Sequence, residues 1–263
     1  MTDLTFEQKI SSLAKQVDDA AFNATAIAQL SGQGHQLSLT EAYQVQDKSL
    51  QRRLDRGEQQ VGIKMGFTSR AKMIQMGVDD MIWGPLTDEM FIEEGGEVAI
   101  SKFIHARVEP EIAFLLKKPL SGNLTLTQVM SAVEAVAPAL EIIDSRYDNF
   151  KFSLEDVVAD NCSSSGFTIG AWQQAGGDIS NLGMVMEFDG NAVEIGSSAA
   201  ILGNPYRSLA AAARVAGEAG KVLPAGSIVL AGAATAAQPI KPGMHIKLHC
   251  EKLGVAEFTV SAN

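Results

Sequence analysis

Apolar residues recur every three or four positions through the first part of the chain, which is the spacing of amphipathic helices. Thr5 with Gln8, and Ser38 with Glu41, have the spacing of capping boxes, in which two side chains satisfy free backbone groups at a helix start. The pattern therefore predicts an N-terminal helical region at residues 1–58.

From residue 59 to residue 263 the pattern changes to short apolar segments rich in β-formers, with turns between them. The expected strands are VGIKMGF, EVAI, RVEPEIAFLL, APALEIID, GFTIGAW, LGMVMEFDG, SIVLAG, HIKLHCE and VAEFTVS. Helices are expected at 125–137, at 153–158 and in PYRSLAAAARVAGEAG. Many short strands without a regular βαβ alternation predict an α+β fold on antiparallel or mixed sheets. A Rossmann fold is excluded because no G-x-G-x-x-G opens a helix.

The formal net charge of −10 over 263 residues argues against nucleic acid or an anionic membrane as the partner. A small anionic substrate remains compatible, provided that the site supplies local positive charge. No apolar run approaches the roughly 18 residues of a membrane span, and no signal peptide precedes the first helix, so we expect a cytoplasmic protein. Two free thiols at Cys162 and Cys250 are favoured over a single disulfide.

Two carboxylates interrupt the apolar strand at HARVEPEIAFLL. Glu109 and Glu111 are two residues apart, so a strand directs both side chains to the same face. Glu141 lies in a second apolar strand, which we expect Pro138 to lead into. Three carboxylates form an oxygen-only ligand set, which suits Mg²⁺ or Mn²⁺. The alternative is a strand face that is open to water.

Lys64 lies between glycines in a β-like run and is the second candidate. A lysine that faces a site would hold a carboxylate or polarise an oxo group, and we expect burial to lower its pKa. The alternative is a lysine at a sheet edge that discourages aggregation.

Small hydroxyl-bearing loops offer further binding groups. ADNCSSSG contains Ser163, and AGAATAAQPIKPG contains Thr235. Each loop is suited to bind a substrate carboxylate, and the alternative is that it only forms a turn. His105 precedes the paired glutamates by four residues and is placed to reach the site mouth. No serine nucleophile motif of the form G-x-S-x-G is present.

Several longer motifs run from about residue 40 to the C-terminus. They are EAYQVQ, VGIKMGFTSRAKMIQMGV, RVEPEIAF, APALEIIDSRYDNFKF, VVADNCSSSGF, AAILGNP and PAGSIVLAGAATAAQPIKPG. Together they resemble the hydratase/decarboxylase group of the fumarylacetoacetate-hydrolase-like superfamily. The resemblance implies a mixed β roll after an N-terminal helical region and an Mg²⁺- or Mn²⁺-dependent enzyme. It places the metal ligands at Glu109, Glu111 and Glu141, and the active-site lysine at Lys64.

Two reactions occur in this group: hydration of 2-hydroxypenta-2,4-dienoate and decarboxylation of 2-oxo-3-hexenedioate. Hydratases of the group usually carry an aspartate where DDMIWG has Ile82. DSRYDNFKF and the histidine of FIHARVEPE also resemble the decarboxylases. An apolar Ile82 beside a departing carboxylate favours loss of CO₂, so we expect a decarboxylase with a 2-oxo dicarboxylate substrate bound by Ile82, His105, Ser163 and Thr235.

Three alternatives remain open. The first is the hydratase reaction, and the second is C–C hydrolysis of acylpyruvates, for which the sequence offers no well-placed base apart from His105. The third is a non-catalytic scaffold subunit for a partner hydratase, since the family suggests that the two associate. We expect a homo-oligomer.

Overall fold

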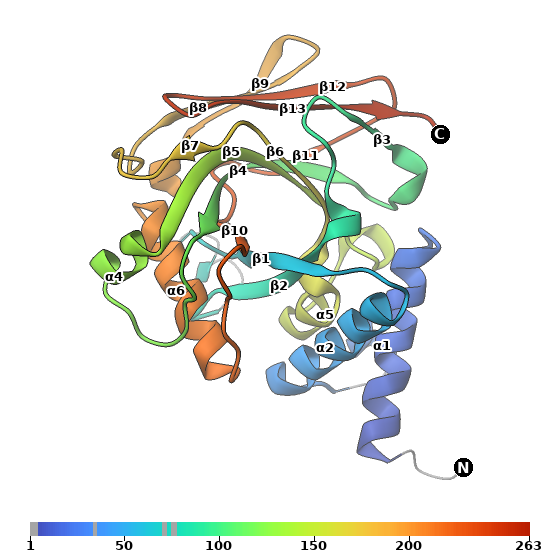
Figure 1. The fold of residues 1–263 in the computed structure, drawn as a ribbon. Helices are drawn as coiled ribbons and strands as arrows, with labels where there is room; N and C mark the ends of the chain where they lie inside the picture. The colour runs from blue at the N-terminus through green and yellow to red at the C-terminus, as the bar shows by residue number, and fades with distance from the viewer. Residues whose placement is uncertain (1–4, 34–35, 70–72, 75–77) are drawn as a thin grey trace.

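Two β-sheets and the helices that flank them form the molecule (Figure 1). The computed structural model describes residues 5–33, 36–69, 73–74 and 78–263. The motif VGIKMGFTSRAKMIQMGV at 61–78 therefore lies partly outside the described residues. No helix in these described ranges is long and apolar enough to cross a membrane.

The larger sheet has eight strands and curls into a roll (Figure 1). Its strands are β1 (Gln60–Gly66), β2 (Ile82–Thr87), β4 (Arg107–Leu116), β5 (Val133–Ile143), β6 (Ser164–Ile169), β7 (Gln173–Gln174), β10 (Ile228–Leu230) and β11 (Gln238–Pro239). They follow the order β2-β1-β10-β4-β5-β6, with β11 paired to β4 and β7 paired to β5. β1 and β10 are parallel and the other pairs are antiparallel, so the sheet is mixed, as expected.

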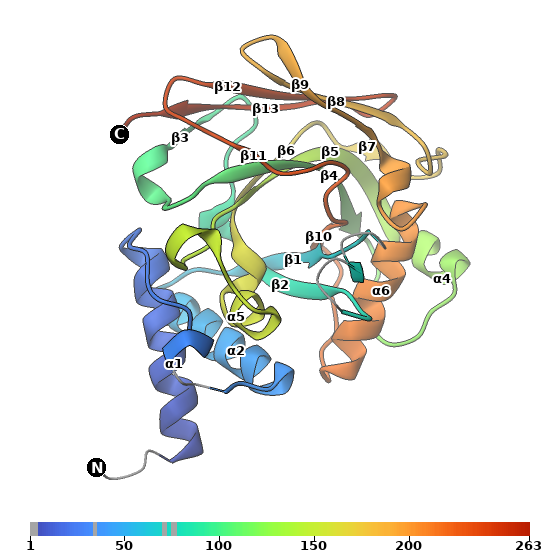
Figure 2. The same ribbon diagram turned by 180° about the vertical axis from the view of Figure 1, so that it is seen from behind.

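The smaller sheet packs over β5 and β6 as a second layer, which Figure 2 shows from behind. Its strands are β3 (Glu97–Ala99), β8 (Gly183–Phe188), β9 (Asn191–Ser197), β12 (His245–Cys250) and β13 (Gly254–Ser261). Their order is β3-β13-β12-β8-β9. The apolar faces of both sheets and one face of the C-terminal helix share one core. The α+β class is confirmed.

The helices begin where their capping residues predict. They are α1 (Phe6–Phe22), α2 (Leu39–Asp55), α4 (Leu126–Ser131), α5 (Leu154–Ala159) and α6 (Pro205–Glu218). The capping boxes at Thr5, Ser38 and Thr125 are all formed. In Figure 1, α1, α2 and α5 lie on one side of the roll, and α4 and α6 lie on the other.

The helix expected at 125–137 was wrong in its length. It ends at Ser131, and β5 begins at Val133 because the apolar residues that follow pair with β4 along its length. Pro138 accordingly lies inside β5 and not at its start. It is tolerated because its missing N–H falls on the side where β7 has ended and β6 begins to pair.

Four strands were not expected from the sequence: β2, β9 and the two-residue strands β7 and β11. Of these, β2 and β9 are edge strands of their sheets. β2 contains Gly84 and Pro85, which weaken a strand signal, and an edge position tolerates a proline. β9 is mostly exposed and therefore lacks the apolar run that identifies a buried strand.

The N-terminal helices pack on the roll through an apolar cluster of their own. Leu13 of α1 and Val45 of α2 belong to this cluster, together with Ile82, Val158 and Cys162 from the part of the chain beyond residue 58. Both Cys162 and Cys250 are free and buried, as expected. The division of the chain into domains at residue 58 stays a prediction.

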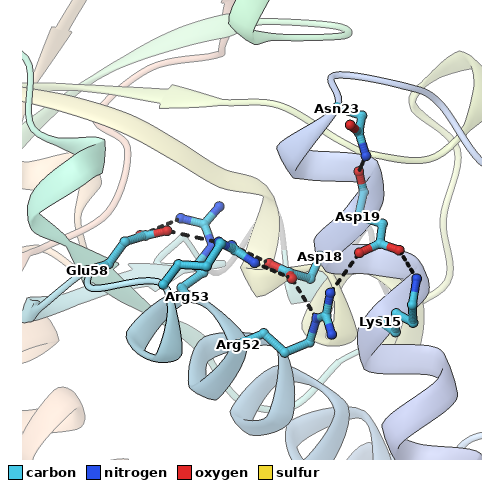
Figure 3. A network of polar contacts seen from close by, with 8 residues as sticks. Lys15, Asp18, Asp19, Asn23, Arg52, Arg53 and Glu58 are labelled. Carbon is cyan, nitrogen blue, oxygen red and sulfur yellow. Dashed lines mark hydrogen bonds and ion pairs between the residues drawn. The ribbon is translucent and has the colours of Figure 1, made fainter.

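Charged residues join α1 to α2 in one network (Figure 3). Asp18 is buried, and its carboxylate accepts hydrogen bonds from Arg52 Nε at 2.6 Å and from Arg56 at 2.7 and 2.8 Å. Burial alone would raise the pKa of Asp18, but the hydrogen bonds and charges of Arg56 and Arg52 lower it below its ordinary value. The network continues from Arg56 to Glu58, just before β1.

We expect Asp18→Asn to lower the free energy of unfolding by about 2 kcal/mol at pH 7, because it leaves two arginines without their buried partner. The pKa of Asp18 is lower in the folded state, so its contribution is present above the unfolded pKa and is lost as pH falls through the folded pKa. The difference between variant and wild type should therefore shrink in acid. Urea unfolding at several pH values measures it. Lys15→Gln, which removes an exposed pair with Asp19, is the control and should change stability by less than about 0.5 kcal/mol.

Candidate active site and metal centre

Strands β4 and β5 place three carboxylates together inside the roll. Glu109 faces Glu141 across the antiparallel pair, and Glu111 is two residues further along β4 on the same face. One carboxylate oxygen from each of the three lies within 4.8 Å of the others. All three side chains are buried, so the alternative of a solvated strand face does not describe the structure.

Neighbouring groups satisfy only part of this oxygen cluster. The Gly232 N–H donates to Glu111 Oε2 at 2.7 Å, and Ser164 Oγ donates to Glu141 Oε1 at 2.8 Å. Glu111 Oε1 is buried and has no hydrogen-bond partner among the described residues. Gly232 has a φ of +104°, and a Cβ there would lie 2.0 Å from Thr68 Oγ1, so only glycine brings this N–H to the carboxylate.

The two fully buried carboxyl groups, those of Glu111 and Glu141, are hard to ionise without a cation. Burial, and then the charge of Glu141, raise the pKa of Glu111 well above its ordinary value. Burial also raises the pKa of Glu141, although Lys64 opposes the shift. Three buried carboxylates with an unpartnered oxygen fit a hard divalent cation, which prefers oxygen ligands and would offset their repulsion. Glu109, Glu111 and Glu141 are therefore the residues that would hold a metal ion here.

Lys64 of β1 lies directly beside this cluster. Its Nζ is 3.1 Å from Glu141 Oε2 and donates to the Cys162 carbonyl oxygen at 3.2 Å. The side chain is only 4% exposed, and β1 lies between β2 and β10, so Lys64 is not a sheet-edge lysine. The expectation of a lowered pKa was wrong. Burial does act to lower the pKa of Lys64, but the charges of Glu141 and Glu109 outweigh it and raise the pKa, which favours the ammonium form.

A cavity of about 530 Å³ opens beside Lys64 and Glu109. Lys64, Glu109, Ile82, Ser163 and Thr235 line it, so the structure brings these predicted residues together. Ser163 Oγ is buried without a hydrogen-bond partner among the described residues. Ile82 is buried opposite Gly66 on β1, where it forms part of an apolar wall.

His105 is not among the described residues that line this cavity. Its backbone N–H donates to the Asp144 carboxylate, and its ring packs at 6.3 Å, edge to face, against Phe150. Phe150 does line the cavity, so His105 supports the wall from behind.

The sequence analysis missed Arg107, which lines the cavity near its mouth. The period of two that groups Glu109 with Glu111 also includes Arg107, and that signal was available in the sequence. The guanidinium carbon lies 4.9 Å from the centre of the Phe150 ring. Lys64 and Arg107 are the two cations among the described lining residues. Lys64 is buried against the glutamates, whereas Arg107 is partly exposed.

Arg146 was also missed, because its role depends on tertiary contacts. It is buried and pairs with Asp160, and it donates through its second terminal nitrogen to the Asp160 carbonyl oxygen at 2.6 Å. Burial raises the pKa of Asp160 to about 6 despite this partner. Arg146 also donates to the Ser164 carbonyl oxygen at 3.3 Å, so one side chain holds both ends of the segment that contains Ser163.

A wider hollow of about 1050 Å³ lies elsewhere, between the end of α1, the start of β1 and the segment around β3. Its described lining contains none of the three clustered glutamates and not Lys64. Chemistry that needs the carboxylates and the lysine therefore belongs to the smaller cavity.

The chain belongs to the fumarylacetoacetate hydrolase C-terminal family, whose model matches residues 63–261. It is 55% identical over 253 residues to a 4-oxalocrotonate decarboxylase from a Pseudomonas species, covering 96% of this chain and 98% of that protein. It is 36% identical to a 2-hydroxypent-2,4-dienoate hydratase from Pseudomonas putida, covering 80% of this chain and 97% of that one.

The fold is also that of a solved relative. A 4-oxalocrotonate decarboxylase from Pseudomonas putida, complexed with magnesium and adipate, superimposes with a TM-score of 0.93 at 40% identity. The match covers 98% of this chain and 99% of that one. The curled mixed roll with its N-terminal helices is therefore the arrangement of this family.

We expect Glu111→Gln to raise the melting temperature of the metal-free protein at neutral pH. The pKa of Glu111 in the wild-type protein is raised in the folded state. The ionised carboxylate therefore destabilises the fold above the unfolded pKa, and this penalty disappears as pH falls. Glutamine has a similar shape without the charge. The gain should be about 1 kcal/mol or more at pH 7.5 and smaller at pH 5.

The same variant should lose its response to metal. Mg²⁺ at a hundredfold excess over its dissociation constant stabilises a single-site protein by about 2.7 kcal/mol. Thermal melts with and without Mg²⁺ should show this shift for the wild type and not for Glu111→Gln. An equal shift in both proteins would exclude Glu111 as a ligand.

Proposed function

We propose that this protein is a metal-dependent decarboxylase that converts 2-oxo-3-hexenedioate to 2-hydroxypenta-2,4-dienoate. The observation that carries the proposal is the buried Glu109, Glu111 and Glu141 cluster beside Lys64, at the closed end of a cavity with an apolar wall. The 55% identity to a 4-oxalocrotonate decarboxylase supports this reaction over hydration. The magnesium in the solved relative supports Mg²⁺ as the ion, with Mn²⁺ as the alternative.

A bound Mg²⁺ would act as a Lewis acid toward the 2-oxo acid end of the substrate. In the reaction, the bond to the distal carboxylate breaks and CO₂ leaves. The electron pair moves through the conjugated double bond to the 2-oxo oxygen, which then takes up a proton. Negative charge therefore develops at the oxygen end of the substrate and disappears from the distal end.

We assign Lys64 to the end of the substrate where negative charge develops. Its ammonium group is fixed by the Cys162 carbonyl and by Glu141, so its charge needs no reorganisation during the reaction. The unpartnered Ser163 hydroxyl faces the same cavity and is available to donate to a substrate oxygen. Thr235 lines the cavity from the opposite loop.

We assign Ile82, which lines the cavity, to the end of the substrate where negative charge is lost. A carboxylate against an apolar side chain is poorly solvated, and neutral CO₂ suffers less from that environment, so the wall favours decarboxylation. Such a wall offers no group to move protons onto a double bond, which hydration needs. Ile82 thus favours the decarboxylase over the hydratase.

Product analysis tests the proposal directly. Purified protein is incubated with 2-oxo-3-hexenedioate with and without Mg²⁺, and CO₂ and the dienoate are measured. We expect both products only with the metal, and Glu109→Gln should abolish them while the fold remains intact. Formation of 4-hydroxy-2-oxopentanoate from the dienoate would establish the hydratase instead, and bound metal without any turnover would favour the scaffold.

We assign Arg107 to the second carboxylate of the substrate. It lies two residues before Glu109, which is about 7 Å along the strand, on the side away from Glu111. Its guanidinium forms no ion pair with any described residue, and its position over the Phe150 ring leaves its N–H groups at the edge of that plane. A substrate with two carboxylates thus meets a cation at each end of the cavity.

We expect Arg107→Leu to raise KM for the dicarboxylate by about 10- to 100-fold, since charge-assisted hydrogen bonds contribute about 1.5–3 kcal/mol. A cation stabilises the carboxylate more than neutral CO₂, so kcat should not fall with it. Inhibition by pyruvate, which has one carboxylate, should be unchanged. Lys118→Leu removes a surface charge away from the cavity and is the control; equal weakening of pyruvate and substrate would assign Arg107 to the 2-oxo acid end.

Three broader features are proposed with the activity: a cytoplasmic location, a homo-oligomer, and association with the hydratase that consumes the product. Edge strand β9 supports association, since Ile195 is 76% exposed and Val193 is also exposed on it. Sedimentation of the protein alone and with the hydratase tests the last two.

A further inference from the structure

Three consecutive residues beside the active site adopt a left-handed backbone. Asn161, Cys162 and Ser163 have φ angles of 49°, 51° and 59°. None is glycine, so each costs conformational energy that the surrounding structure must overcome. We call these three residues the left-handed turn. Strain of this kind is retained where a local geometry is needed for function.

The left-handed turn presents two groups to the cavity. The Cys162 carbonyl oxygen accepts the hydrogen bond from Lys64, and the Ser163 hydroxyl is buried without a partner among the described residues. Both residues line the cavity. The thiol of Cys162 is not a nucleophile here, because burial raises its pKa to about 12. The turn therefore acts through its backbone and through Ser163.

Gly84 allows the turn to approach β1. It pairs with Lys64 across β1 and β2, and it has no side chain. A Cβ at Gly84 would lie 2.7 Å from the Asn161 carbonyl oxygen, which is too close without a shift of the turn. The backbone of the left-handed turn therefore occupies the space that a side chain at position 84, opposite Lys64, would fill.

One side chain from the N-terminal region holds the elements on both sides of the turn. Gln46 of α2 donates through Nε2 to the Trp83 carbonyl oxygen of β2 at 3.1 Å and to the Val158 carbonyl oxygen of α5 at 2.9 Å. The same nitrogen lies 3.8 Å from Cys162 Sγ, and that thiol donates to the Trp83 carbonyl oxygen at 3.1 Å. A single amide thus connects the strand that faces Lys64, the helix that leads into the turn and the turn itself.

Packing alone does not account for this amide. Gln46 is 1% exposed, and its Oε1 has no hydrogen-bond partner among the described residues. A buried amide with an unpaired oxygen costs free energy that a methionine of similar length would not. What the amide provides in return is the pair of hydrogen bonds to β2 and α5.

We propose that Gln46 is a positioning residue for Lys64, acting through the left-handed turn, so that helix α2 is part of the catalytic apparatus. The proposal rests on the proposed decarboxylase function only for its kinetic test. Gln46 does not touch the cavity; it fixes where the Cys162 carbonyl and the Ser163 hydroxyl stand.

The test compares Gln46→Met with Ser49→Ala. The control removes a buried hydroxyl one turn further along α2 that forms no hydrogen bond with the left-handed turn among the described residues. Misplacement of a catalytic group by about 1 Å can cost about a hundredfold in rate. We therefore expect Gln46→Met to lower kcat by about 10- to 100-fold, with KM and the Mg²⁺-dependent shift in melting temperature within twofold of the wild type. Ser49→Ala should retain the wild-type kcat.

A second measurement does not depend on turnover. Acetylation of Lys64 by acetic anhydride at one fixed pH, followed by mass spectrometry, reports how firmly its amine is held. Gln46→Met should increase the labelling rate several-fold, and Ser49→Ala should not. Gly84→Ala should displace the left-handed turn from the β2 side, and we expect it to increase the labelling rate of Lys64 as Gln46→Met does. It replaces Gln46→Met in the test if Gln46→Met does not fold. Wild-type kcat and labelling in Gln46→Met would overturn the proposal, whereas absence of CO₂ release by the wild type would overturn only the proposed function.

Discussion

The repulsion among three buried carboxylates is the constraint on which the rest of the structure depends. Glu109, Glu111 and Glu141 each lose the solvation that water would provide, and their charges lie close together. Among the described contacts of Glu111 and Glu141, the Lys64 ammonium group, the Ser164 hydroxyl and the Gly232 N–H offset part of this charge. Glu111 Oε1 has no hydrogen-bond partner among the described residues, and a divalent cation is the chemical group that completes such a set.

The strands that carry the carboxylate cluster tolerate its repulsion because both backbone pairing and side-chain contacts fix their positions. β4 and β5 pair along their whole length, so the glutamates do not separate without loss of many backbone hydrogen bonds. Arg146 fixes both ends of the segment from Asp160 to Ser164, and Ser164 in turn donates to Glu141. The left-handed turn within that segment is the point where this framework reaches Lys64.

Much of the fold follows from local sequence signals, and the site follows only in part. Capping boxes and the alternation of glutamates depend on neighbours along the chain, so helix starts and the shared face of Glu109 and Glu111 were predictable. The residues after Ser131 favour helix locally, but pairing with β4 makes them a strand, and no local signal reports that partner. The raised pKa of Lys64 depends in the same way on Glu141, which lies 77 positions further along the chain. Arg107 was within reach, because it shares the period of the two glutamates.

The two ends of the cavity differ in their chemistry. This difference explains how a change of one side chain would select one reaction over the other. The closed end, with carboxylates and an ammonium group, suits any 2-oxo acid that delivers negative charge to its oxo oxygen. In the proposed reaction, the other end of the substrate decides its fate: Ile82 would exclude water from the carboxylate that leaves, and Arg107 would select molecules that possess one. A carboxylate side chain in place of Ile82 would repel that group and bring a proton carrier to the double bond. On this proposal, specificity for loss of CO₂ depends on the absence of charge at Ile82 of β2 as much as on the charges buried in β4 and β5.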